Sequence, residues 1–99
     1  MVECNLTLLC PPALEEKLLD ALLMLPQVVV FTSTPTAAHG VASGLSAMEQ
    51  VLGRALVTQI QVLLALADKD LVLSTIRRDF AGAGVRFWIT PILHEGAIL

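Results

Sequence analysis

Tyrosine is absent from this 99-residue chain, and basic residues are few. The six lysines and arginines are spread singly except for Arg77-Arg78, and the formal net charge is −3. A surface that follows a phosphate backbone needs clustered basic residues, and base stacking needs exposed aromatic rings on central strands. Only Phe87 and Trp88 are adjacent, and neighbouring strand residues point to opposite faces. We therefore expect no nucleic-acid partner.

Long hydrophobic runs are also absent, although 56% of the residues are hydrophobic. No apolar segment reaches the roughly 18 residues of a membrane helix. The best candidate, residues 18–31, carries Asp20 and is broken by Pro26. The first ten residues lack a basic segment and contain Glu3, which does not fit a signal peptide. We expect a cytoplasmic protein without a transmembrane segment, whose apolar excess is buried between subunits of an obligate oligomer.

The residues of common catalytic and metal sites are scarce. Cys4 and Cys10 are the only cysteines, and their spacing matches neither C-x-x-C nor a common zinc pattern. Both fall on the apolar side of an alternating segment, which favours two buried, reduced thiols. No serine has a sequence cue that pairs it with a base, and His39 and His94 are the only histidines. The sequence therefore predicts no active site, hence no enzyme, and assigns no cofactor.

Hydrophobic periodicity divides the chain into four strands and two helices. Alternation and β-branched residues predict strands at 3–10, 27–33, 55–66 and 85–90. The pair Pro11-Pro12 starts a helix that ends at Pro26, and Asp68 is the expected N-cap of a second helix that ends in the segment 81–84. The predicted apolar stripes of the two helices consist of Leu14, Leu18, Leu19, Leu22 and Leu25, and of Val72, Leu73, Ile76 and Phe80.

The order of these elements predicts an α+β fold. Two right-handed β-α-β units give a ferredoxin-like plait, a four-stranded antiparallel sheet with both helices on one face. The whole chain then forms a single domain, residues 1–99. Two helices cover only one side of the sheet, so we expect the other side to meet partner chains. In the third strand, that side carries Val57, Gln59, Gln61 and Leu63.

Two segments between the elements are unusual in composition. Residues 34–54 form a predicted long loop that contains His39, Gly40 and Arg54, with a capping box at Ser46 and Glu49 that predicts one helical turn. The second segment, 80–86, carries Gly82 and Gly84 followed by Arg86. Backbone amides of such a glycine loop can bind an anion, but a plain helix C-cap is the favoured explanation of the two glycines.

Several stretches resemble a known family. The segments "LTLLCPPALEEKLLDALL", "GLSAMEQVLGR", "QVLLALAD" and "AGAGVRFWITPIL" are similar, in the same order, to a small uncharacterised bacterial PII-like family that is often encoded beside heavy-metal efflux systems. PII-like (nitrogen regulatory protein-like) proteins are trimeric, non-enzymatic signalling modules, and the CutA-type proteins share their architecture. The resemblance covers essentially the whole chain.

The resemblance implies a homotrimer that binds a small effector or a partner protein, with a possible role beside heavy-metal efflux. Residues 34–54 would correspond to the T-loop and 80–86 to the B-loop, and effectors would lie between subunits near both loops and the C-terminal tail. The candidate ligand contacts carried over are His39, Gly40, Arg54, Gly82, Gly84 and Arg86, with His94 and Glu95 from the tail.

A second hypothesis is direct binding of divalent metal by a CutA-like metal-tolerance protein. Its candidate ligands are His39, Glu49 and His94. Transition-metal sites prefer histidine and cysteine and normally need at least three converging ligands. One histidine per subunit would converge only around a threefold axis, or with His94 of a neighbouring subunit.

Overall fold

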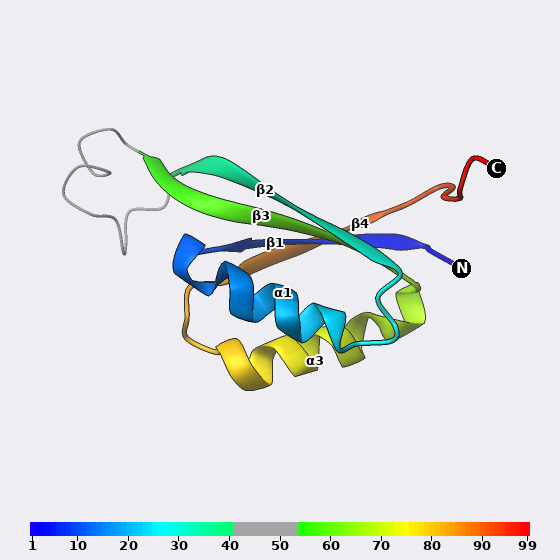
Figure 1. The fold of residues 1–99 in the computed structure, drawn as a ribbon, viewed down its shortest axis with the longest axis horizontal. Helices are drawn as coiled ribbons and strands as arrows, with labels where there is room; N and C mark the ends of the chain where they lie inside the picture. Colours follow the sequence, from blue (N-terminus) through cyan, green and yellow to red (C-terminus); the bar gives the residue numbers. More distant parts are fainter. Residues whose placement is uncertain (41–53) are drawn as a thin grey trace.

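The computed structural model describes residues 1–40 and 54–99, which form four strands and two α-helices preceded by short 3-10 turns (Figure 1). The elements in chain order are β1 (Cys4–Cys10), η1 (Pro12–Leu14), α1 (Glu15–Leu23), β2 (Val30–His39), β3 (Arg54–Leu64), η2 (Leu66–Asp68), α3 (Lys69–Phe80) and β4 (Arg86–Pro91). None of the helices in these residues has the length and apolar character needed to cross a membrane.

The strands form one antiparallel sheet in the order β2-β3-β1-β4, and both helices lie on one side of it (Figure 1). This is the ferredoxin-like plait that the sequence predicts. Its two central strands, β1 and β3, are the two most apolar segments of the sheet. The register pairs Cys4 with Leu64 and Cys10 with Thr58 along β1 and β3. The fold class is therefore confirmed.

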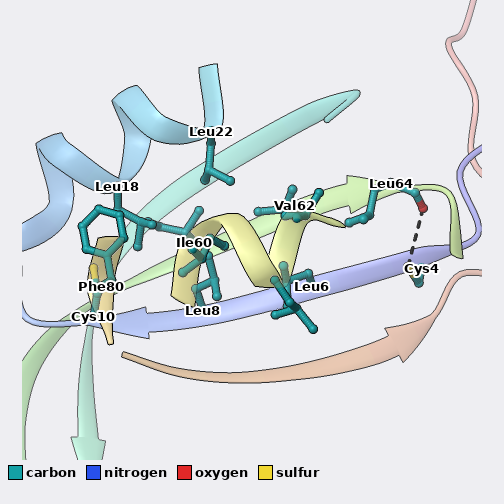
Figure 2. Packing of buried hydrophobic residues seen from close by; sticks show 13 residues of the cluster. Cys4, Leu6, Leu8, Cys10, Leu18, Leu22, Ile60, Val62, Leu64 and Phe80 are labelled. Atoms are coloured by element: carbon teal, nitrogen blue, oxygen red, sulfur yellow. Dashed lines mark hydrogen bonds between the residues drawn. The ribbon is translucent and has the colours of Figure 1, made fainter. Parts of the chain in front are cut away.

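The core lies between the helices and the facing side of the sheet (Figure 2). Alternate residues of β1 and β3 point into it because successive side chains of a strand face opposite sides. Leu8 is fully buried, and its register partners are Ile60 in β3 and Phe87 in β4. The predicted thiol positions are confirmed, since Cys4 and Cys10 are buried and unbridged. The Cys4 thiol lies 3.6 Å from the carbonyl oxygen of Leu64 and donates to it.

The two helices present the predicted stripes to this core. In α1, Leu18 and Leu22 are buried and Leu19 is partly buried against the core cluster. Two further stripe residues, Leu14 in η1 and Leu25 beyond the end of α1, are also partly buried against it. In α3, all four predicted stripe residues are buried. Asp68 takes the N-cap position of α3, but its side chain makes no capping hydrogen bond because the 3-10 turn η2 already precedes the helix.

The predicted boundaries of the long loop are wrong at its start. Residues 34–39 continue β2, so the strand runs to His39 instead of ending near Ser33. The first residues assigned to that strand are also wrong, since Pro26 and Gln27 form a turn and β2 begins at Val30. Pro35 lies within β2, which is an edge strand, where a missing N–H can face away from the sheet.

Candidate functional site

The side of the sheet that faces away from the helices is called here the open face. The register places its side chains in three rows that cross all four strands. The rows consist of Val30, Leu63, Asn5 and Thr90, then Thr32, Gln61, Thr7 and Trp88, then Thr34, Gln59, Leu9 and Arg86. These three rows are thus mainly polar, with apolar side chains at Val30, Leu63, Leu9 and Trp88, and Val57 continues the same face of β3. The sequence assigns Val57, Gln59, Gln61 and Leu63 to this side, and that assignment is confirmed.

The centre of the open face is packed tightly within the single chain. Thr7 is only 4% exposed although no helix covers it, because it lies between Gln61 and Trp88 in its row. The amide nitrogen of Asn5 donates to the side-chain oxygen of Gln61 over 2.8 Å. The side-chain oxygen of Asn5 is buried and has no partner. A buried acceptor without a partner costs free energy, and a donor from outside the chain would remove that cost.

The candidate contacts from the long loop lie at the far end of the β2–β3 hairpin. His39 is exposed and pairs with Arg54 in the ladder, and Gly40 follows with a positive φ of 82°. Such a φ favours glycine, and the backbone conformation therefore explains why residue 40 is a glycine. Glu49 and the capping box at Ser46 lie outside the described residues, as does most of the predicted loop.

The glycine loop joins α3 to β4 and packs on the turn after β1. Gly82 and Gly84 both have positive φ, 75° and 85°. The helix ends there, with the amide of Ala81 donating to the carbonyl of Arg77 over 3.1 Å. A Cβ atom added at Gly84 would lie 3.7 Å from Cγ of Pro11. The loop therefore has a structural role as the C-terminal cap of α3.

Arginines flank the glycine loop on both sides. Arg86 is exposed and begins β4, opposite Leu9. The guanidinium of Arg77 lies 5.6 Å from the ring centre of Phe87, within the range of a cation–π contact. The loop end of the domain therefore offers positive charge beside backbone amides, an arrangement that suits an anionic group.

The hairpin end and the glycine loop are separate in one chain. Arg86 lies in the same row as Gln59, and Arg54 is five residues farther along β3. At about 3.4 Å per residue and about 4.8 Å per strand, Arg54 and Arg86 are about 20 Å apart. The six candidate contacts thus form two groups of three, one at the end of the β2–β3 hairpin and one at the glycine loop.

Two of the three metal candidates, His39 and His94, are not brought together in one chain, and the third, Glu49, lies outside the described residues. His39 lies at the hairpin end, whereas the chain carrying His94 leaves the opposite end of the sheet (Figure 1). Within residues 1–40 and 54–99, no three histidine, cysteine or acidic side chains group as metal ligands. Burial, with a smaller effect of the nearby carboxylates Glu3 and Glu15, raises the pKa of the Cys4 and Cys10 thiols, which disfavours the thiolate that binds metal. The structure offers no support for the metal hypothesis.

Comparison with known proteins identifies the family. The model of the family described as "Protein of unknown function (DUF3240)" matches residues 2–99. The chain belongs to the DUF3240 family. A crystal structure of a DUF3240 family protein from Shewanella baltica OS155 has a TM-score of 0.81 at 16% identity, over 100% of this chain and 99% of that one. No curated protein sequence matches the chain.

Two further solved structures extend the likeness of this DUF3240 protein to PII-like folds. One is a nitrogen regulatory PII-like protein of Thiomonas intermedia K12, solved with ADP, AMP and bicarbonate, with a TM-score of 0.72 at 14% identity over 99% of this chain and 98% of that one. The other is GlnK of B. subtilis, with a TM-score of 0.68 at 16% identity over 94% and 87%. The PII-like fold predicted from the sequence is confirmed.

On the open face, Thr7, Trp88 and Asn5 were not among the candidates taken from the sequence, whereas Arg86 was. Thr7 and Trp88 carry no recognisable motif, and the alternation of β1 only indicated that Thr7 faces away from the core. One signal for the open face was available in the sequence: the two polar residues Gln59 and Gln61 alternate with apolar residues in β3. This alternation shows that one side of β3 is polar, but only the strand order shows that β3 is a central strand whose polar side is flanked by other strands.

Proposed function

We propose that this DUF3240 protein is a cytoplasmic, non-enzymatic regulatory protein of PII-like type. It assembles into a homotrimer through the open face and binds a small effector or a partner protein between subunits, at the hairpin end and the glycine loop. The observation that carries the proposal is the likeness of the whole chain to PII-like proteins, together with a sheet that is covered on one side only.

The assembly is supported by the amount of apolar surface that the single chain leaves exposed. Large apolar side chains outside the core include Val30 and Trp88 on the open face and Leu56 on β3. A four-stranded sheet in water normally buries its second apolar side or keeps it polar throughout. The unpartnered oxygen of Asn5 lies on the same face, where a neighbouring subunit would supply a donor.

The effector site is supported by the separation of the two groups of candidate contacts. Arg54, which pairs with His39 at the hairpin end, is about 20 Å from Arg86, the residue that follows the glycine loop of the same chain, as derived above from the sheet register. In an assembly, the hairpin of one subunit can approach the glycine loop of another. The glycine loop carries no basic residue between Ala81 and Val85, so we expect a ligand with less negative charge than a triphosphate.

The nucleotides of the Thiomonas protein provide the first probes. ADP and AMP, each with and without bicarbonate, are added to the full chain and the melting temperature is measured. A ligand at about 100 times its Kd stabilises the native state by about 2.7 kcal/mol, which shifts the melting temperature of a domain of this size by several degrees. We expect the shift to be lost in Arg86→Ala and kept in Lys17→Ala, which removes an equal charge from α1.

Two outcomes would contradict the proposal. One is an absence of any shift for nucleotides, nucleotide second messengers and divalent metals combined with a monomeric chain. The other is turnover of the bound compound that is lost on replacing Arg86, which would indicate an enzyme. The connection with heavy-metal efflux that the resemblance implies stays a prediction. It can be tested by comparing the sensitivity of a deletion strain and its parent to cadmium, zinc and copper.

A further inference from the structure

We draw no further inference here: the strongest candidate, the exposed apolar patch of Leu23 and Met24 at the end of α1 with Val29 and Val30 at the start of β2, carries none because nothing in residues 1–40 and 54–99 shows what covers it.

Discussion

Thr7 and Trp88 lie directly opposite each other on β1 and β4, on the side of the sheet that no helix covers. Thr7 is 4% exposed, whereas Trp88 is 44% exposed. The centre of the open face is therefore already closed to water by its own side chains, and the tryptophan ring is the part that still offers apolar surface. A large ring with one accessible side is typical of a residue at a protein interface.

A charge on the open face is expected to break the assembly without unfolding the chain. Thr32 is exposed and sits beside Gln61 in the central row, so a glutamate there would be desolvated on association. We expect Thr32→Glu to lower the solution mass to that of a single chain while the circular dichroism spectrum stays unchanged. Ser74→Glu adds the same charge to the exposed side of α3 and is expected to leave the mass unaltered. An intact assembly in Thr32→Glu would place the interface elsewhere.

The core of the sheet is expected to respond strongly to truncation. Leu8 lies on the central strand β1, opposite Ile60 of β3, and its side chain is fully buried in the core. Leu8→Ala removes buried methyl groups and leaves a cavity, which lowers the free energy of unfolding by about 2–5 kcal/mol. Leu23→Ala, at an exposed position, is expected to change it by less than about 0.5 kcal/mol. Urea denaturation at one protein concentration measures both, and equal effects would contradict the assigned core.

The glycine loop is expected to tolerate no side chain at position 84 without strain. The φ of Gly84 is +85°, a conformation that costs a non-glycine residue about 1–2 kcal/mol, although a Cβ atom would meet Pro11 only at an ordinary distance. We expect Gly84→Ala to lower stability by that amount. Gly96→Ala, which meets nothing and has no positive φ, is expected to be neutral. A neutral Gly84→Ala would show that the loop adopts another conformation in solution.

The two thiols are expected to make the protein less stable at alkaline pH. Burial raises the pKa of both Cys4 and Cys10 in the folded state above the ordinary value of 9.0. The unfolded chain therefore loses its thiol protons first, and the stability that is present below about pH 9 falls as the pH rises further. The chain has no tyrosine that would titrate in the same range. Urea denaturation between pH 7 and pH 10 measures the slope, and the Cys4→Ala, Cys10→Ala double variant is expected to flatten it.

The fold followed from the sequence because its local signals agree with one another. The alternation of β1 and the stripes of the two helices separate buried from exposed residues, and the order of the elements then allows few topologies. The start of the long loop was wrong because Pro35 and the small residues after it carry no strand signal of their own. Residues 34–39 are strand because β3 provides a partner, and that long-range pairing is not written in the local pattern.

The sequence predicted individual features of the candidate site, but not how these features lie relative to one another. The glycines of the segment 81–84 indicated a loop with positive φ, and Gly82 and Gly84 have it. The sequence could not show that His39 and His94 lie at opposite ends of the sheet, since distance between loops is a property of the topology. Likewise, the predicted plait places β4 beside β1, but the sequence did not predict the register that sets Thr7 opposite Trp88.

The most direct test of the central claim, that the open face is an interface between copies, is the solution mass of the full chain by light scattering with size-exclusion chromatography. One chain has a mass of 10.6 kDa. We expect the wild type at micromolar concentration to elute with three times that mass, and Thr32→Glu to elute with the mass of one chain. A wild-type chain that stays monomeric across the concentration range would contradict both the assembly and the intersubunit effector site.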